Sequence, residues 1–436
     1  MEPKKCCGGV TSLNWKNRGF LDQFGPVTGC SLAATPEFSL LLNLGLAISA
    51  AFGFSFLFSR IKQPVVLGQL IAGIIIGPFG LGLIQDLGTI NLLASLGIVL
   101  LLFTVGLELD PLEIRKIGTD SFILAAVELT ISFVSVFGVA LLVGLSTIEA
   151  VFVGAVVATT STAIMSKILL ESKSFHAKES EMVITASVIE DFATVFILLL
   201  LPGLAAASNQ VASTDLALLV AKGILLVAVI FVFGWKIAPR IIDRVTQSDQ
   251  EYKETAFLLA LSFGFVFALV SSFLGFSPAV GAFLMGLMIR GKQATFVLDK
   301  VGSVKDLFIV LFFVSMGTLI NMGAVLTLTL PILAVIATAI LGKYWGCWTG
   351  AKLSAAKGEA SKVGMSMLPR GEFSFIVASE GAGLGVASQI LFPVAGLTTL
   401  VSSFLSSFGM RLLKARATKA AEIAIPLKEK RAEKTA

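Results

Sequence analysis

Residues 181–205 read EMVITASVIEDFATVFILLLLPGLA, and within this stretch the acids Glu190 and Asp191 stand side by side. The only other charged residue is Glu181, at the first position. An apolar run of this length can cross the hydrocarbon core of a bilayer, about 30 Å thick, as a helix. The stretch therefore places two carboxylates in the middle of a segment that is otherwise suited to lipid, where a charge requires a specific reason.

The composition of the whole chain agrees with this reading of the stretch. Apolar residues make up 56% of the sequence and charged residues only 14%, and the mean hydropathy is +0.92. The apolar runs are continuous instead of alternating, and lipid admits only helices and closed barrels. The sequence therefore predicts an all-α polytopic membrane protein.

The spacing of the apolar runs predicts about thirteen transmembrane helices. The run at 277–290 is short for a span, so we expect it to extend into its neighbours or to pair with a broken segment. The predicted spans are 38–58, 64–84, 90–107, 119–143, 147–170, 181–205, 214–235, 254–273, 277–290, 306–323, 325–348, 360–383 and 387–409.

Lys and Arg fall in every second connection between these spans, as with Arg60 and Lys62 or Lys352 and Lys357. Short cytoplasmic loops collect such residues. With an odd number of spans, the N-terminus lies outside and the C-terminus in the cytoplasm of a multi-pass protein of the cell membrane; the basic N-terminal tail is the one exception to the pattern. We divide the chain into an N-terminal tail (1–37), a transmembrane domain (38–410) and a short basic cytoplasmic tail (411–436).

Several classes of function lack the residues that they need. The only histidine is His176, in a predicted cytoplasmic loop, and the four cysteines have no metal-ligand spacing. An enzyme would need a nucleophile with a base or a metal cluster, so we expect neither catalysis nor a cofactor. The formal charge of +5 comes largely from cytoplasmic loops and predicts no nucleic-acid partner.

Two pairs of phrases indicate an internal repeat. QPVVLGQLIAGIIIGP (63–78) resembles FSPAVGAFLMGLMIRG (276–291), and LLLFTVGLELDP (100–111) resembles VLFFVSMGTLIN (310–321). The copies lie about two hundred residues and seven predicted spans apart, and an odd offset gives them opposite orientations in the membrane. Inverted repeats of this kind are typical of secondary transporters.

The repeat aligns the spans at 147–170 and 360–383, and each contains an interruption. The first carries the run Thr159, Thr160, Ser161, Thr162, whose hydroxyls compete for backbone groups. The second carries Pro369, Arg370, Gly371 and Glu372, where proline removes a backbone donor. Two discontinuous helices that cross near the midplane would direct half-helix ends and free carbonyls at a small ion.

Five phrases in order resemble the cation:proton antiporters, in the branch of NapA-type sodium/proton antiporters and Kef-type potassium/proton antiporters. They are QPVVLGQLIAGIIIGP, LGIVLLLFTVGLELDP, ATTSTAI, VIEDFATV and LPRGEFSFIVA, within residues 40–410. The resemblance implies a fold of thirteen helices with two crossed, discontinuous helices. It also implies a homodimer in which a core domain moves against a dimerisation domain, an elevator form of alternating access.

The resemblance also implies roles for single residues. Asp191 matches the family's essential ion-binding aspartate, and Glu190 matches the variable position before it, where glutamate is a departure from the usual residues. Lys343 matches a lysine that pairs with the first acid in NapA-type proteins. The crossing segments are matched by two pairs of residues, Thr160 with Ser161 and Arg370 with Glu372.

The chemistry of a buried carboxylate leads to the same function. A carboxylate near the bilayer midplane is costly unless a proton, a cation or a basic group neutralises it. Alkali cations take oxygen ligands, which Asp191 could supply together with Glu190 and the hydroxyls of Thr160 and Ser161. We therefore expect exchange of a monovalent cation for H⁺. The resemblance favours Na⁺, with Li⁺ as a further substrate, because the charged Glu190 with Lys343 is similar to the pair in the sodium/proton antiporters. If Lys343 releases a proton when the cation binds, two protons move per cation.

Other readings stay open at this stage. One is a K⁺/H⁺ antiporter of the Kef type without its regulatory domain, and a weaker one is a cation channel. The Glu190–Lys343 contact could be purely architectural, and the hydroxyl run could serve helix packing. Arg370 and Glu372 could be structural charges that satisfy each other and the backbone at the helix break. Three further acids lie in or next to the predicted spans. We interpret Glu128 as a possible accessory to the ion-binding site, and Glu108 and Asp110 as solvated residues.

Overall fold

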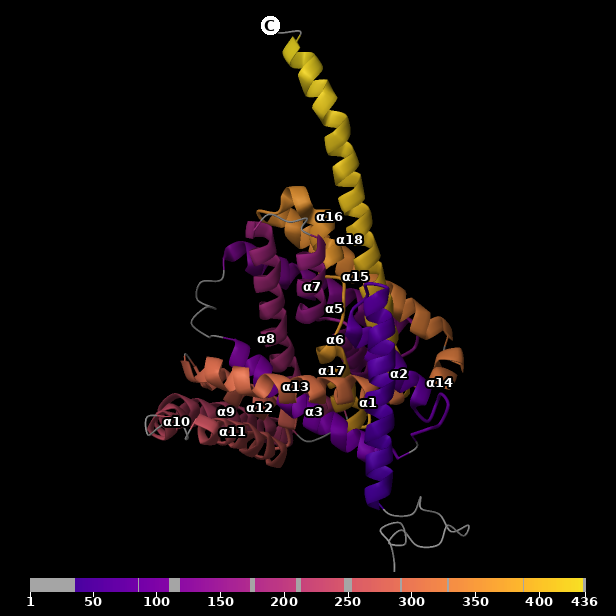
Figure 1. Cartoon of the computed structure of the whole chain (residues 1–436). Helices are drawn as coiled ribbons and strands as arrows, with labels where there is room; N and C mark the ends of the chain where they lie inside the picture. The colour runs from indigo at the N-terminus through magenta and orange to yellow at the C-terminus, as the bar shows by residue number, and fades with distance from the viewer. Residues whose placement is uncertain are drawn as a thin grey trace, which may run out of the picture. The chain divides into compact units, whose positions relative to one another are not determined.

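The structure is a computed structural model that describes residues 36–84, 86–109, 118–172, 177–208, 213–246, 253–290, 292–327, 329–386 and 388–433 (Figure 1). The regular secondary structure in these ranges is helical throughout. The chain divides into two compact units, Met1–Leu44 and Gly45–Ala436, and the arrangement described below is that of the second unit. The predicted all-α, multi-span architecture is thereby confirmed.

The helices follow the predicted apolar runs along the chain. Among the described residues, six helices are long and apolar enough to cross a membrane, and five shorter apolar helices accompany them; the count of thirteen spans stays a prediction. In chain order the helices are α1 (Pro36–Arg60), α2 (Val65–Ile76), α3 (Leu87–Glu108), α5 (Thr119–Leu142), α6 (Thr147–Val156), α7 (Thr162–Ser172), α8 (Ala177–Ser208), α9 (Ser213–Val232), α10 (Ala238–Thr246), α11 (Lys253–Phe273), α12 (Pro278–Met288), α13 (Lys292–Thr318), α14 (Met322–Thr327), α15 (Thr329–Leu353), α16 (Ala360–Ser366), α17 (Glu372–Gly383) and α18 (Ser388–Glu433).

One group of helices contains both copies of the repeated phrases. Helix α3 packs against α12 and α13, α13 also packs against α2, and α11 packs against α12. Gly73 and Gly286 occupy the same position in the two copies of the first phrase. A Cβ at Gly73 would lie 2.1 Å from the carbonyl oxygen of Val314, and one at Gly286 would lie 2.2 Å from that of Phe103. Glycine thus permits an equivalent close helix crossing in each copy, as the repeat predicts.

A second group of helices surrounds the interrupted spans. Helix α15 packs against α5 and α16, α6 packs against α5 and α17, and α17 packs against α18. In Figure 1 the labels of α5, α6, α15 and α17 lie close together in the middle of this group. The predicted tail boundary at residue 410 falls within α18, which continues as one helix to Glu433.

Helix α8 contacts both groups. It packs against α5, α6, α7 and α17 of the second group, and also against α9 and α12. The rings of Phe192 on α8 and Phe283 on α12 meet edge to face, with centroids 5.8 Å apart. Because Phe192 directly follows Asp191, the acidic pair lies on the helix that joins the two groups.

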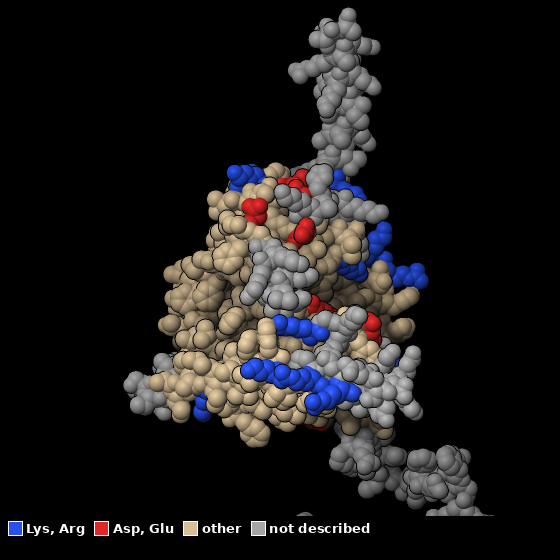
Figure 2. Space-filling view, turned by 90° about the vertical axis from the view of Figure 1, so that its left-hand side faces the viewer, with Lys and Arg blue, Asp and Glu red and all other residues tan. Residues whose placement is uncertain are grey.

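The surface carries the apolar residues that a bilayer requires. Leu41, Phe52, Leu142 and Phe273 are among the large apolar side chains that are more than two-thirds exposed. Figure 2 shows one face, where residues other than Lys, Arg, Asp and Glu cover most of the described surface. Large apolar side chains exposed in this number are unfavourable in water and are typical of surfaces that face lipid.

Candidate ion-binding site

The two predicted interruptions are present, and they touch each other. The first separates α6 from α7 at residues 157–161, and the second separates α16 from α17 at residues 367–371. The backbone N–H of Ser161 donates to the carbonyl oxygen of Pro369 over 2.8 Å. A Cβ at Gly371 would lie 2.5 Å from the Cβ of Ser161, so glycine is needed for the two segments to come this close.

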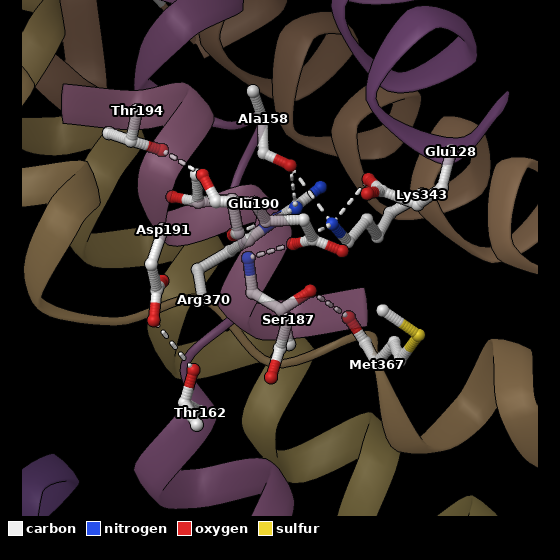
Figure 3. A network of polar contacts seen from close by, with 12 residues as sticks. Glu128, Ala158, Thr162, Ser187, Glu190, Asp191, Thr194, Lys343, Met367 and Arg370 are labelled. Carbon is white, nitrogen blue, oxygen red and sulfur yellow. Dashed lines mark hydrogen bonds and ion pairs between the residues drawn. The ribbon is translucent and has the colours of Figure 1, made fainter. Parts of the chain in front are cut away.

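Helix α8 passes beside these interruptions and presents Glu190 and Asp191 to them. Neighbouring residues on an α-helix point about 100° apart, so two adjacent acids face different surroundings. The surroundings of Glu190 and Asp191 differ strongly. Glu190 lies among charged partners, whereas Asp191 lies beside a hydroxyl (Figure 3).

Lys343 of α15 lies between two glutamates. Its Nζ donates to Oε2 of Glu190 over 3.0 Å and to the carbonyl oxygen of Ala158 over 2.9 Å, and it forms a further ion pair with Glu128 of α5. The side chains of Lys343, Glu128 and Glu190 are fully buried. An ammonium group has three protons to donate, so these three acceptors use its full capacity.

Arg370 adds a second positive charge to this cluster. Its guanidinium donates to three carbonyl oxygens, those of Ala158 (3.2 Å), Thr159 (3.1 Å) and Ala339 (3.0 Å). Its charge also interacts with those of Glu128 and Glu190. Two carboxylates and two cations therefore balance. We refer to Glu128, Glu190, Lys343 and Arg370 as the charge cluster.

The placement of Arg370 differs from one sequence expectation. Arg370 and Glu372 form no ion pair among those found between the described residues. Arg370 instead satisfies the carbonyls that the first interruption leaves without helical partners. Glu372 accepts a hydrogen bond from Ser161 Oγ over 3.3 Å. The two residues thus serve different neighbours, because the chain turns at Gly371 between them.

Asp191 has no such compensation. Its Oδ2 accepts a hydrogen bond from Thr162 Oγ1 over 3.2 Å, and its Oδ1 has no hydrogen-bond partner among the described residues. Among the ion pairs of the described chain, none includes Asp191. The charges that act on it most strongly are those of the carboxylates Glu372 and Glu190. It is 5% exposed, against 0% for Glu190.

Two further carboxylates lead from Asp191 towards the surface. Glu372 is half-buried at the start of α17, and Glu108 at the end of α3 is exposed. Glu108 pairs with Lys305 of α13 over 3.0 Å, with side chains 49% and 24% exposed. Both Glu372 and Glu108 interact electrostatically with Asp191. Negative charge therefore extends from an exposed position to the buried one.

The residues expected from the sequence separate into two places. Glu190, Lys343 and Thr160 lie in or beside the charge cluster; the Thr160 N–H donates to Glu190 Oε2 over 2.8 Å and its hydroxyl donates to the Met367 carbonyl over 3.1 Å. Asp191 lies outside the cluster. Glu372 interacts electrostatically with Asp191, and Ser161 donates a hydrogen bond to Glu372. Asp110 and His176 lie outside the described residues.

Thr162 and Glu128 make closer contacts with the site residues than the sequence indicated. Thr162 is the hydroxyl that contacts Asp191, and Glu128 is the second acid on Lys343. Both were visible as members of a pattern, Thr162 as the last residue of the hydroxyl run and Glu128 as a mid-span acid. What the sequence lacks is the direction of each side chain across helices, which depends on how α5, α7 and α15 pack.

The fold and this pair of polar sites are typical of a secondary transporter with two discontinuous helices that meet at their interruptions. Residues 46–413 match the family described as sodium/hydrogen exchanger, transmembrane. The chain belongs to this family. It is therefore a cation/proton antiporter and a transporter instead of an enzyme, as the resemblance implied.

Known relatives share most of the chain. It is 28% identical over 375 residues to the Na(+)/H(+)-K(+) antiporter GerN of Bacillus cereus, covering 85% of this chain and 95% of that protein. It is 29% identical over 368 residues to K(+) efflux antiporter 5 of Arabidopsis thaliana, covering 82% and 63%. The structure of the sodium proton antiporter MjNhaP1 from Methanocaldococcus jannaschii is similar in fold, with a TM-score of 0.66, 18% identity and coverage of 88% of this chain and 98% of that one.

Proposed function

We propose that this protein exchanges a monovalent cation for H⁺ by alternating access, and that the two compete for Asp191. The observation that carries the proposal is the absence of a basic partner for Asp191 among the described residues, next to a cluster in which both carboxylates pair with Lys343. An uncompensated carboxylate at this depth is costly, so a proton or a cation has to occupy it. The same oxygens cannot bind both at once.

The cation ligands follow from the same geometry. Alkali cations take several oxygen ligands, and Asp191 with Thr162 supplies the first two. The Ser161–Glu372 pair is the next source of oxygens, because the charges of Glu372 and Asp191 interact. Proton and cation thereby reach a group whose neighbours are hydroxyl and carboxylate oxygens, and no ion pair in the described part of the chain joins it to an ammonium or guanidinium.

Movement of the site between the two faces requires one helix group to shift against the other. Helix α8 carries Asp191 and contacts α12 of the first group through the Phe192–Phe283 ring pair. A site at this boundary is exposed to one side or the other when the groups move. A bare, charged Asp191 resists this movement because it would enter a low-dielectric region, and that penalty couples the two ions.

We further propose that one proton moves per cation. Two protons per cation would require Lys343 to lose its proton during the cycle. Lys343 has two carboxylates and a carbonyl as acceptors, so its neutral form would leave the buried carboxylates Glu128 and Glu190 without their ion-pair partner and with Arg370 as the one remaining cation of the cluster. We therefore infer that the charge cluster stays intact, and that Asp191 alone changes its occupant.

For the cation we propose Na⁺, with Li⁺ as a second substrate and K⁺ as the alternative. GerN is described by its name as a Na(+)/H(+)-K(+) antiporter, and the plant relative as a K(+) efflux antiporter, so both ions occur among similar proteins. The compact pair Asp191–Thr162 supports the smaller ion. We also propose a homodimer in the cell membrane, with the N-terminus outside and the C-terminus in the cytoplasm.

The test is exchange in proteoliposomes, with a pH-sensitive dye inside and Na⁺, Li⁺ or K⁺ added outside. Wild type should show cation-driven proton flux, and Asp191→Asn should reduce it to the level of empty liposomes. Asp120→Asn, at an acid near the first turn of α5, is a matched control and should retain the flux. Normal flux in Asp191→Asn would overturn the assignment, and flux with K⁺ alone would move the cation to the Kef-type alternative.

A further inference from the structure

A basic pocket lies away from the ion-binding site, where three helices meet. Its volume is about 510 Å³. The end of α1, the helix α7 and the later part of α18 contribute to it. The residues that line it are Ser59, Lys62, Lys167, Ile168, Ser407, Met410, Arg411 and Lys414.

Four of these eight residues carry a positive charge, and none of the eight is an acid. The walls of the pocket are linked directly, since Arg411 Nη2 donates to the carbonyl oxygen of Lys62 over 2.9 Å. Lys62 has a φ of +57°, a left-handed conformation that is uncommon for a residue other than glycine. Basic side chains from three helices that converge on one pocket provide several donors for a single anion.

The chemistry of the lining identifies the class of anion. Lys and Arg side chains bind phosphate oxygens with charge-assisted hydrogen bonds, and the hydroxyls of Ser59 and Ser407 can add neutral ones. Basic pockets between transmembrane helices bind phospholipid headgroups on the cytoplasmic side. Lys62, Lys167 and Arg411 belong to connections that the sequence assigns to that side.

We propose that this pocket binds a phosphate-bearing anion, either a phospholipid headgroup or a soluble polyphosphate. The bound anion would contact α1, α7 and α18 at once. Helix α7 begins at Thr162, five residues and about 7.5 Å of helix before Lys167. An occupant of the pocket therefore links α1 to the helix that contacts Asp191, and it slows the exchange cycle; only this last consequence rests on the proposed function.

Binding is measured on the full chain, with lipid and soluble probes in separate arms. In the first arm the protein is placed in nanodiscs of phosphatidylcholine with or without phosphatidylglycerol or cardiolipin, and lipids retained after purification are identified by native mass spectrometry. In the second arm pyrophosphate is titrated in detergent. The readout is the midpoint of thermal unfolding, and the proton-flux assay follows as a separate measurement.

The variants compare charge inside and outside the pocket. Lys167→Gln/Lys414→Gln removes two pocket charges, and Lys167→Arg/Lys414→Arg keeps them. Lys236→Gln/Lys300→Gln removes two exposed charges elsewhere and is the matched control. Each basic residue near an anionic surface contributes about fivefold in affinity, so the first variant should bind about 25-fold more weakly. Lys62→Gln should bind about fivefold more weakly and serves if the double variant does not fold.

The outcomes separate the sources of the anion. Stabilisation by anionic lipid alone assigns a headgroup, and stabilisation by pyrophosphate alone assigns a soluble anion. Either result supports the pocket if the Gln variants lose the effect while the Arg variant and the matched control keep it. Equal stabilisation of wild type and Lys167→Gln/Lys414→Gln, or none in wild type, overturns the proposal. Normal binding with unchanged flux would reject only the effect on exchange.

Discussion

Glu190 and Asp191 are neighbours in the chain, and they lie in opposite kinds of electrostatic environment. Glu190 is fully buried and has Lys343 and the Thr160 N–H as partners, with Arg370 nearby. Asp191 has one hydroxyl contact and, among the described residues, no basic partner. The charge cluster contains its own counter-charges, and the Asp191 site does not.

This difference suggests separate roles in folding stability for the charge cluster and in transport for Asp191. Breaking a buried ion pair by removing one partner is strongly destabilising, because it leaves a charge without compensation. A carboxylate that lacks a fixed partner can instead accept a mobile one. We therefore propose that the charge cluster stabilises the contact between the interrupted helices, and that Asp191 is the group that exchanges its occupant.

The largest expected effect is on stability, from Lys343→Met. The substitution leaves Glu128 and Glu190 buried without their shared cation, and it should lower the free energy of unfolding by about 3–5 kcal/mol. Denaturant unfolding in detergent measures it. Lys300→Met, at an exposed lysine, is the control and should change stability by less than about 0.5 kcal/mol. Near-normal stability in Lys343→Met would show that the cluster is not a structural unit.

A smaller effect is expected for Glu190→Gln. The amide keeps an oxygen for the Thr160 N–H, and Lys343 keeps Glu128, so we expect a loss of about 1–3 kcal/mol in stability. Cation-driven proton flux should persist at one proton per cation, and because such exchange moves no net charge, the flux should not change when the membrane potential is clamped at different values. A complete loss of flux in folded Glu190→Gln protein would place the exchanging group in the cluster.

Thr162→Ala should affect the cation without affecting the fold. It removes the hydroxyl that contacts Asp191, and the loss of one neutral ligand should raise the apparent KM for the cation about tenfold, equivalent to ~1.4 kcal/mol. Thr194→Ala is a matched control, because that hydroxyl donates to the carbonyl of Glu190 on its own helix. Equal KM values for the two variants would remove Thr162 from the site.

The smallest effect is expected for Glu108, the exposed acid of the three carboxylates Asp191, Glu372 and Glu108. Glu108→Gln removes one charge and its pair with Lys305, and exposed ion pairs contribute about 0.2–1 kcal/mol. The apparent KM for the cation should rise no more than about fivefold, and the difference should shrink at high ionic strength. A larger change that is insensitive to salt would indicate that Glu108 binds the cation directly.

Much of this comparison could be predicted from the sequence, since the hydroxyl run at 159–162 and the segment 369–372 indicated the interruptions, and Glu190 with Asp191 indicated a polar midplane. The partners of each residue could not. Thr160 and Ser161 were expected beside Asp191, but the hydroxyl that contacts it is that of Thr162, because α7 starts there and turns the preceding residues towards α16 and α17. Arg370 and Glu372 were expected to satisfy each other and the backbone; Arg370 donates to carbonyls of the first interruption, and no ion pair between the two residues occurs in the described part of the chain. Which hydrogen-bond partner each side chain reaches depends on the angles at which the helices cross.

Proton release on cation binding tests the role of Asp191 most directly. Purified protein in weak buffer is titrated with NaCl, and the protons released are counted with a pH-sensitive dye, with choline chloride as the control salt. Because cation and proton compete for one carboxylate, wild type and Glu190→Gln should each release about one proton per bound cation, and Asp191→Asn should release none. Equal release from Asp191→Asn and wild type would show that the exchanging group lies elsewhere.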